Sequence, residues 1–397
     1  MMKNIVQILR KNLSKPFFSD YRTQVGLWIL LSLVAFFAKS RADRHNNFLI
    51  YKYEFWHTFH LQPLYEQYPQ EYFDSNHYGP LFSLIVAPFA IVPEWMGLML
   101  WLVALSVFLY VAVRELPLAK RQHAFIIWFS AHELLTALFM QQFNIAVVAL
   151  IVLTYVCIEK EKDFWAAFFI MIGVFVKLYG IVGLAFFFFS KHKWRFAGSC
   201  VVWALILFVL PMCISTPDFI VNQYVAWFES LSSKNAENLF ALSQNVSLLG
   251  MIRKISGNSD YSDLGLIIGG IILFVLPYLR VRQYRYKAFR EMWLASVLMF
   301  VVLFSTGTES STYIIAFIGV SVWYIAVPWK RSRLDLVLLI LVFVLSSLSP
   351  SDLFPKPVRE LWVKPYALKA LPVVLVWLKL LYEMCKRNYN PIKTDEI

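Results

Sequence analysis

The chain has 397 residues, of which 59% are hydrophobic and only 16% are charged, and its formal net charge is +12. Soluble domains carry about 25% charged residues, so this composition excludes an ordinary soluble protein and indicates a polytopic membrane protein. The positive charge lies in short loops between apolar segments. This is the pattern of cytoplasmic loops under the positive-inside rule, and it argues against nucleic-acid binding. The four cysteines lack metal-ligand spacing and predict neither a zinc site nor a disulfide framework.

The N-terminal part combines a basic region with the first apolar segment. Residues 3–15 carry several Lys and Arg residues, which predicts a cytoplasmic N-terminus. The apolar segment 25–38 follows and is predicted to run outward as a retained first helix. A cleaved signal peptide is the alternative, but the segment ends in Ala-Lys-Ser-Arg without a small-x-small cleavage pattern.

A long loop, residues 39–93, follows the first helix and is rich in polar, aromatic and acidic residues. Because it is not basic, it is predicted to lie on the extracytoplasmic side, where a large loop held by many helices suggests chemistry on a lipid-linked substrate. Within it, the apolar segment 80–92 is bounded by Pro80 and Pro93 and is too short for a full span. It is predicted to form an interfacial or re-entrant helix. An ordinary short span with one loop on the unexpected side is the alternative.

Short basic loops mark the cytoplasmic side in the rest of the chain. They lie at 114–121, 159–163, 191–195, 280–290 and 330–333, with a basic tail from residue 386. The apolar segments between these loops form pairs that can each cross the membrane twice. The pairs are 124–140 with 144–158, 196–214 with 263–279, 291–306 with 312–328, and 334–349 with 367–384. The sequence therefore predicts one all-α integral membrane domain, residues 1–397, with about 12 helical segments and both termini in the cytoplasm.

The apolar stretch 164–189 lies between two basic loops and does not fit this pairing. Its 26 residues are too few for two spans of about 20 residues each. It is predicted to form two half-length helices that meet at residues 177–180, which places Lys177 near membrane depth. A cation there is costly and commonly functional, and broken helices are tolerated where they line a cavity.

Two carboxylates in the first outer loop are candidates for a general base. Asp43 lies just past the outer end of the first helix, and Asp74 lies just before the 80–92 segment. A carboxylate so placed can take the proton of a hydroxyl group as that hydroxyl attacks. Helix capping or a solvated loop charge is the alternative for each.

Polar residues also gather in the other outer loops. Glu309 lies in a tight turn between two predicted spans, and the polar turn 141–144 lies between two others. Gln244 precedes a short apolar helix within the outer loop 215–262. The segment 219–231 of the same loop is predicted to form an amphipathic helix on the bilayer surface. Capping of helix ends is the alternative role for these polar residues.

Charged residues at unexpected places are candidates as well. Arg253 and Lys254 would lie on the outer side, against the positive-inside rule, which suggests that they bind a lipid phosphate. A surface salt bridge is the alternative. His132 and Glu133 lie inside an apolar span, where ionisable residues are commonly functional, although a hydrogen bond between the two would satisfy both. The sequence contains no Walker motif, nucleotide-binding glycine loop, His-Glu-x-x-His motif or Asp-x-Asp pair, so no metal site is predicted.

Several short motifs are spread along the chain. They are Asn47-Phe-Leu-Ile-Tyr51, Pro63-Leu-Tyr65, Tyr78-Gly-Pro-Leu81, Ala87-Pro-Phe-Ala-Ile-Val-Pro93 with Trp101, Gln142-Phe-Asn144, Lys177 followed by an apolar run and Lys193-Trp-Arg195, and Asn245-Val-Ser-Leu248. Together they resemble the polytopic GT-C glycosyltransferases of glycosyltransferase family 87. The resemblance implies a GT-C-type helical bundle with a catalytic aspartate in a large first outer loop. It also implies a polyprenyl-phosphate sugar, usually mannose, as donor, and no nucleotide site or other cofactor.

One departure from the family pattern concerns the base. Many members carry Asp directly before the aromatic-x-x-Tyr run, where this chain has Asn47. By resemblance the base is then Asp43, shifted along the loop, or Asp74 in its place. Their positive charge and unexpected positions make Lys177 and Arg253 the candidates for binding the donor phosphate. The residues expected to shape the sugar and acceptor pocket are Asn46, Asn47, Tyr51, His77, Tyr78, Gln142, Asn144, Gln244 and Glu309.

These features favour a membrane glycosyltransferase that moves a hexose, with mannose the expected sugar, from a polyprenyl-phosphate donor to a lipid or glycan acceptor. The reaction is expected on the extracytoplasmic face of a bacterial inner membrane. Direct displacement assisted by a base predicts inversion at the anomeric carbon. A flippase or transporter of lipid-linked sugars is one alternative, although no inverted repeat is apparent in the sequence. An O-antigen-type polymerase or ligase, or a non-catalytic assembly factor, is another.

Overall fold

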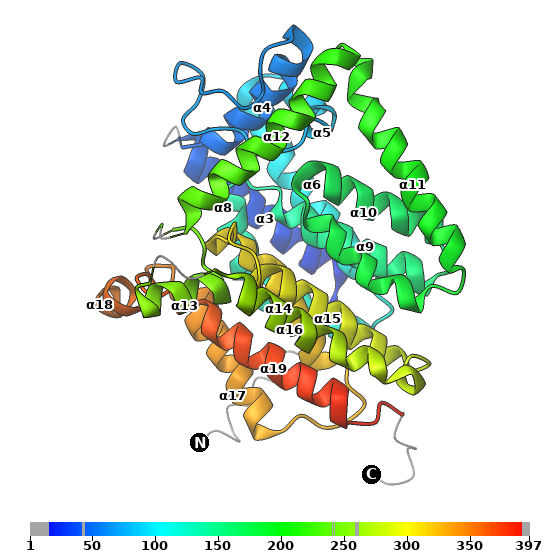
Figure 1. The fold of residues 1–397 in the computed structure, drawn as a ribbon. Coiled ribbons are helices and arrows are strands. Elements are labelled where there is room, and N and C mark those ends of the chain that lie inside the picture. The colour runs from blue at the N-terminus through cyan, green and yellow to red at the C-terminus, as the bar shows by residue number, and fades with distance from the viewer. Residues whose placement is uncertain (1–15, 42–43, 240, 242, 259–261, 391–397) are drawn as a thin grey trace.

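The computed structural model describes residues 16–41, 44–239, 241, 243–258 and 262–390, and every regular element in that part of the chain is a helix. The longer helices pack side by side into one bundle (Figure 1). This confirms the all-α class that the sequence predicts.

The centre of the bundle consists of apolar helices that are buried along nearly their whole length. They are α9 (Asn144–Glu159), α15 (Lys287–Leu303) and α16 (Tyr313–Ile325), with α19 (Ala370–Lys386) packed against them. α15 and α16 pack closely because Gly319 has no side chain. A Cβ atom on Gly319 would lie 2.9 Å from the carbonyl oxygen of Ala295. Small residues permit such close approach between membrane helices.

Within the described part of the chain, three helices are long and apolar enough to cross a membrane. They are α3 (Tyr21–Ser40), α6 (Glu94–Glu115) and the continuous segment Lys193–Cys213, which consists of α11 (Lys193–Val209) and η2 (Leu210–Cys213). α11 exposes Val201, Leu205 and Val209 on its outer face, each by more than half of its surface. A contiguous apolar face of this kind suits contact with lipid. The further crossings in the predicted set of about 12 segments stay a prediction.

The stretch 164–189 is broken where the sequence predicts. Its two parts are α10 (Asp163–Lys177) and η1 (Tyr179–Phe189), a 3-10 helix that returns along α10. Between them, Leu178 has a left-handed backbone with a φ of 59°. Gly173 and Gly180 permit the close return, because a Cβ atom on Gly180 would lie 2.6 Å from the Cα atom of Gly173. The break leaves Lys177 at the end of a half-length helix.

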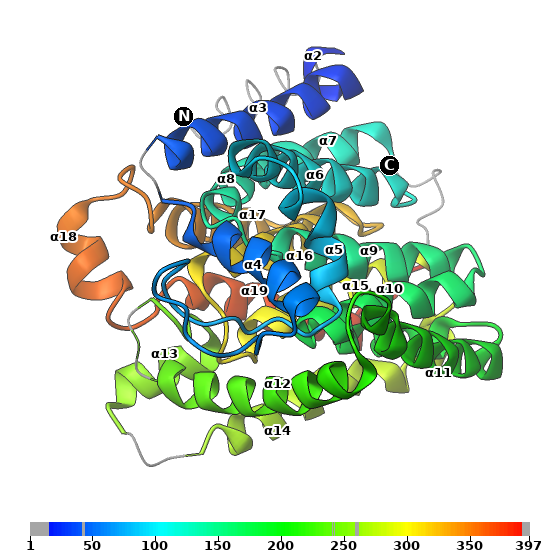
Figure 2. The ribbon, with the colours of Figure 1, turned by 90° about the horizontal axis from the view of Figure 1, so that it is seen from above.

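Four helices belong to the two long loops. They are α4 (Asn46–His60), α5 (Phe82–Ala90), α12 (Pro217–Asn238) and α13 (Leu248–Ser256). Figure 2, in which the molecule of Figure 1 is seen from above, shows α4 near the middle of the view and α12 along one side. α5 has nine residues and is about 14 Å long, so it is too short to span a membrane, as predicted for segment 80–92. α12 contains the predicted helix 219–231.

Two predicted spans are interrupted. Segment 124–140 divides at Ser130, and segment 334–349 changes from an α-helix into a π-helix after Leu341. The parts are α7 (Lys120–Phe129), α8 (Ala131–Phe139), α17 (Arg333–Leu341) and η6 (Val342–Leu348). The remaining elements are α2 (Pro16–Ser19), α14 (Leu264–Val275), η3 (Leu276–Leu279), η4 (Val281–Gln283), η5 (Ser310–Thr312), α18 (Lys356–Val358) and η7 (Arg359–Val363). Interrupted helices are tolerated in membranes where surrounding protein satisfies the freed backbone groups.

Candidate active site

A polar cavity of about 280 Å³ lies where α4, the loop before α5, the break after α10, α12 and the turn before α16 meet. Nine of the residues predicted for the site line it. They are Asn47, Tyr51, Asp74, His77, Tyr78, Gln142, Lys177, Gln244 and Glu309. These residues come from segments that are far apart in the chain, so the fold gathers them into one place.

Lys177 ends α10 and brings a positive charge to this polar cavity. Its Nζ donates a hydrogen bond of 2.8 Å to the Asn144 amide oxygen, and it lies 5.3 Å and 5.5 Å from the ring centroids of Tyr78 and Tyr179. Among the residues that the structure describes, these partners are uncharged, and no carboxylate forms an ion pair with Lys177. A partly buried cation with neutral partners is costly, so a ligand that brings negative charge would stabilise it.

Asp74 lies at the rim of the cavity in an uncommon backbone conformation. Its φ of 74° falls in the left-handed region, which Asp and Asn tolerate better than other side chains. Its Oδ1 accepts a hydrogen bond of 2.9 Å from the Ser75 N–H and lies 3.5 Å from Nζ of Lys234. Lys234 also lies 3.6 Å from the Glu237 carboxylate. The Asp74 side chain is 59% exposed, so a substrate hydroxyl can reach it.

Glu309 belongs to a hydrogen-bonded network on the wall of the cavity. Its carboxylate accepts a hydrogen bond of 2.6 Å from Gln142, and its backbone N–H donates to the Thr312 hydroxyl at 3.1 Å. Asn144 lies behind the lining and donates to the Gln142 amide oxygen at 2.5 Å and to Thr312 at 3.2 Å. Because Asn144 also accepts from Lys177, the network connects the carboxylate to the cation.

His77 approaches the cavity from the first loop and is held by α12. Its Nδ1 lies 2.8 Å from the Ser230 hydroxyl, and its backbone carbonyl accepts a hydrogen bond of 2.9 Å from the Trp227 indole. Burial, followed by the nearby charge of Lys234, lowers the pKa of His77 to about 4. The imidazole is therefore neutral near pH 7, and it can form hydrogen bonds but does not neutralise a phosphate.

Tyrosine and amide groups complete the wall. The hydroxyls of Tyr51 and Tyr78 lie 3.1 Å apart. Gln244 is held at the wall by Lys254, whose Nζ donates to the carbonyl oxygens of Ala241 and Gln244, each at 2.9 Å. Burial lowers the pKa of Lys254 to about 8. Lys254 therefore holds the loop that carries Gln244 and does not line the cavity itself.

Two further predicted site residues, Asn46 and Arg253, do not line this cavity. A third, Asp43, falls outside the described residues. Asn46 exchanges hydrogen bonds of 2.6 Å and 2.7 Å with the backbone of Phe73. Arg253 is 3% exposed, lies 3.1 Å from the Asp263 carboxylate and lines the adjoining larger cavity, so its predicted contact with the donor phosphate stays a prediction.

A larger cavity of about 690 Å³ adjoins the polar one. Their walls share Leu178, Tyr179, Asn235, Ser305 and Thr306. Most of the larger cavity is lined by apolar side chains, including Ile181, Leu264 and Phe304. An apolar cavity beside a polar one can hold a ligand with a polar head and a hydrocarbon tail.

Sequence reasoning did not single out Lys234, Tyr179 or Asn235, which line the polar cavity. Lys234 carries the same signal that drew attention to Arg253, because it is a basic residue in a predicted outer loop. Tyr179 and Asn235 carry no such signal. The turn after α10 and the course of α12 bring them to the cavity.

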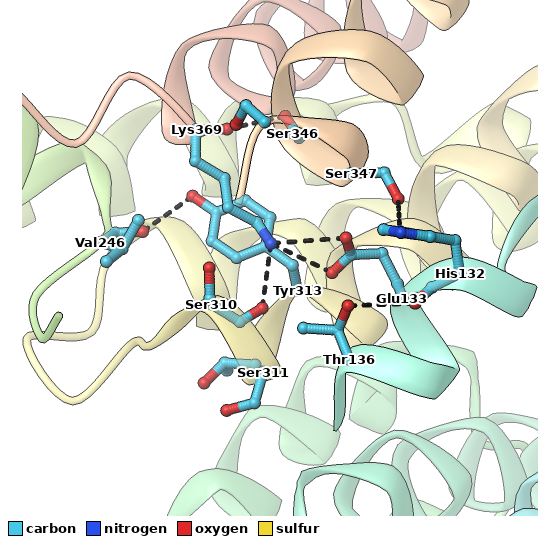
Figure 3. A network of polar contacts seen from close by, with 12 residues as sticks. His132, Glu133, Thr136, Val246, Ser310, Ser311, Tyr313, Ser346, Ser347 and Lys369 are labelled. Atoms are coloured by element: carbon cyan, nitrogen blue, oxygen red, sulfur yellow. Dashed lines mark hydrogen bonds and ion pairs between the residues drawn. The ribbon is translucent and has the colours of Figure 1, made fainter. Parts of the chain in front are cut away.

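A buried ion pair lies next to the cavity wall (Figure 3). Nζ of Lys369 lies 3.2 Å from the Glu133 carboxylate and donates to the Ser310 carbonyl at 3.0 Å. His132 instead forms a hydrogen bond of 2.8 Å with Ser347 through Nδ1. The alternative in which His132 and Glu133 form a hydrogen bond with each other is therefore wrong. Consecutive residues on a helix do not face each other, so their side chains find different partners.

The apolar helices and the polar cavity between them define an integral membrane protein with an enzyme-like site. A sequence profile described as glycosyltransferase family 87 matches residues 76–306, which is more than half of the chain. The chain therefore belongs to glycosyltransferase family 87 and is a membrane glycosyltransferase, as its sequence motifs indicate.

One solved structure similar to this chain is the crystal structure of ArnT from Cupriavidus metallidurans bound to undecaprenyl phosphate. The two share 13% sequence identity with a TM-score of 0.39, and the match covers 92% of this chain and 78% of ArnT. At this similarity the likeness carries no argument about the site. No curated protein matches the chain significantly.

Proposed function

We propose that this glycosyltransferase takes a hexose, with mannose the expected sugar, from a polyprenyl-phosphate donor and transfers it to a lipid or glycan acceptor on the extracytoplasmic face. The proposal rests chiefly on one observation: a polar cavity that contains Lys177, Asp74 and Glu309 adjoins a larger apolar cavity. A polyprenyl phosphate has the matching chemistry, because an anionic head is joined to a long hydrocarbon tail. The scheme uses no cofactor, since the donor carries its own leaving group.

Lys177 would act on the leaving group. When the bond between the anomeric carbon and the phosphate oxygen breaks, the phosphate takes the electron pair and its negative charge grows. A cation already held in place stabilises this charge without reorganisation. Lys234 supplies a second cation in the role predicted for Arg253, although Asp74 and Glu237 lie within 3.5 Å and 3.6 Å of its Nζ.

A carboxylate would take the proton of the acceptor hydroxyl while the hydroxyl oxygen bonds to the anomeric carbon, which inverts this centre. Of the two carboxylates in the lining, Glu309 is engaged by the Gln142 amide, whereas Asp74 is exposed at the rim. We therefore assign Asp74 as the base and Glu309 to sugar binding. Asp43 remains the alternative base that the family resemblance implies.

The test is a transfer assay with the purified protein, radiolabelled polyprenyl-phosphate mannose and a lipid extract from the source cells. Asp74→Asn should lower transfer by about 1000-fold without loss of protein from the membrane. Asp43→Asn and Glu309→Gln are measured beside it, and loss confined to Asp43→Asn would move the base to Asp43. Transfer at the wild-type rate by both Asp→Asn variants would contradict the mechanism. A donor that the wild type binds but never consumes would favour a transporter.

A further inference from the structure

A second polar cavity, of about 560 Å³, lies against the same wall as the candidate active site. We refer to it as the acceptor cavity. Five residues line both cavities, namely Asn47, Asp74, Gln142, Gln244 and Glu309. The carboxylates of Asp74 and Glu309 are thus reached from two sides. This is the arrangement that a transfer between two different substrates requires, because the base must meet the acceptor while the donor occupies the other cavity.

The remaining lining of the acceptor cavity is rich in hydroxyl groups. These come from α8, from the loop before α13, from the turn before α16 and from the turn after η6. The polar members are His132, Thr136, Ser243, Ser310, Ser311 and Ser351. Hydroxyls and amides both donate and accept hydrogen bonds, so this lining matches a ligand that carries several hydroxyl groups of its own.

The charges of the two cavities differ. Lys177 and Lys234 line the polar cavity, whereas no Lys or Arg is found among the described residues that line the acceptor cavity. The acceptor cavity instead carries the carboxylates of Asp74, Glu309 and Asp352.

Several basic residues contact the lining of this cavity from outside it. Lys369 donates to the Ser310 carbonyl from behind the lining, and its charge is paired with Glu133 (Figure 3). Arg359 lies 2.8 Å from the Asp352 carboxylate.

Lys234 lies between the carboxylates of Asp74 and Glu237. Nζ of Lys39 lies 5.7 Å from the centroid of the Phe139 ring. A phosphate in the acceptor cavity would therefore face three carboxylates and no Lys or Arg in the described lining, which is unfavourable.

We propose that the acceptor cavity binds the acceptor and selects a neutral, polyhydroxylated headgroup over one that bears a phosphate. A sugar hydroxyl can donate to the Asp74 or Glu309 carboxylate, and hydrogen bonds to charged groups are the stronger ones. The inference rests on the proposed function for the direction of transfer. It adds the chemical class of the acceptor, a neutral sugar carried by a lipid or by a free glycan.

The test measures binding of acceptor probes in the absence of donor. A negative result here is therefore distinguishable from a negative result in the transfer assay, which tests the proposed function. The full chain in nanodiscs is titrated with octyl hexoside and with octyl hexoside 6-phosphate, and the signal of empty nanodiscs is subtracted. The neutral probe should bind about tenfold more tightly at low ionic strength. The titration is repeated in the double variant Lys177→Met/Lys234→Met, in which both lysines of the neighbouring cavity are replaced. Equal or tighter binding of the phosphate probe in that variant overturns the proposal.

A matched pair of variants locates the effect. Ser243 is exposed on the wall of the acceptor cavity, and Ser233 is exposed on α12, where it lines a different cavity. Ser243→Arg should improve binding of the phosphate probe about fivefold relative to the neutral probe, the scale of one exposed charge contact. Ser233→Arg should leave this ratio unchanged. Equal shifts in the two variants, or none in Ser243→Arg, would overturn the assignment of this cavity.

A free hexose oligosaccharide is then added as competitor. Displacement of octyl hexoside supports a neutral glycan acceptor. Retention of octyl hexoside, with the phosphate probe still excluded, supports a neutral sugar attached to lipid.

Discussion

Two lysines enclosed by the helix bundle, Lys177 and Lys369, have different surroundings. Lys369 lies 3.2 Å from the Glu133 carboxylate, and its Nζ lies 4.5 Å from the centroid of the Tyr313 ring. Lys177 has the Asn144 amide and two tyrosine rings instead. The charge of Lys369 is therefore compensated inside the protein, whereas the charge of Lys177 is available to a ligand.

On the proposed mechanism, this difference separates a charge that stabilises the fold from one that acts in the reaction. Burial of an ion pair costs desolvation energy that the attraction within the pair offsets, so removal of one partner leaves the cost uncompensated. A cation without an internal counterion gains most when an anion binds. The contrast leads to the following predictions, of which the largest concerns Lys369.

Lys369→Met should lower the free energy of unfolding by about 3–5 kcal/mol, because Glu133 is then buried without a partner. Thermal unfolding in detergent measures the loss. Adding Glu133→Leu to the same chain should recover most of it, since both charges are then absent. A single variant as stable as the wild type would mean that Lys369 does not stabilise the fold in this way.

Lys177→Met should lower transfer by about 100–1000-fold, the scale of removing one group that stabilises charge in a transition state. Its melting temperature should stay the same or rise, because a cation without a counterion is removed. Lys177→Arg keeps the charge and should retain measurable transfer. Normal activity with a large loss of stability in Lys177→Met would reverse the roles of the two lysines.

Asn144→Ala should lower kcat by about tenfold, because Asn144 positions the ammonium group of Lys177 through a charge-assisted hydrogen bond. The KM for the donor should change less than kcat if the positioning matters chiefly in the transition state. Asn46→Ala is the matched control, since Asn46 bonds the Phe73 backbone outside the polar cavity. Equal losses in both variants would argue against a positioning role for Asn144.

The last effect concerns the pH dependence of stability. The pKa of His77 is lowered from 6.5 to about 4 in the folded protein, so the unfolded chain binds more protons between these values. The stability that neutral His77 contributes is complete above pH 6.5 and is lost as the pH falls toward 4, by about 3 kcal/mol. Thermal unfolding across this window measures the loss. In His77→Gln, stability should change less between pH 6.5 and pH 4. If the pH dependence of stability is unchanged in that variant, another group is responsible for it.

Parts of the fold could be predicted because hydropathy and length leave few choices. Residues 164–189 are too short for two spans, so a break at Lys177 follows from membrane thickness, and segment 80–92 is limited in the same way. The break at Ser130 and the π-helix after Leu341 could not be predicted. Their sequences are as apolar as an unbroken span, and the groups that satisfy the interrupted backbone come from distant parts of the chain.

Part of the candidate site could be predicted, because short turns between membrane spans lie at the ends of the helices and bring their polar residues together there. Gln142, Lys177 and Glu309 meet for this reason. Arg253 and Lys234 show the limit of the argument, because both are basic residues in the same outer loop. The fold pairs Arg253 with Asp263 and leads Lys234 to the polar cavity, and their sequence neighbourhoods do not distinguish these outcomes.

By itself, the sequence determined that this chain is an all-helical membrane protein with the motifs of its glycosyltransferase family, because apolar length and residue type act locally along the chain. The tertiary structure alone decided which charges are paired and which remain available to substrates. An ion pair such as Lys369 with Glu133 joins residues 236 positions apart. Its energy depends on the distance between two side chains and on their removal from water, and neither can be calculated until the helices are packed.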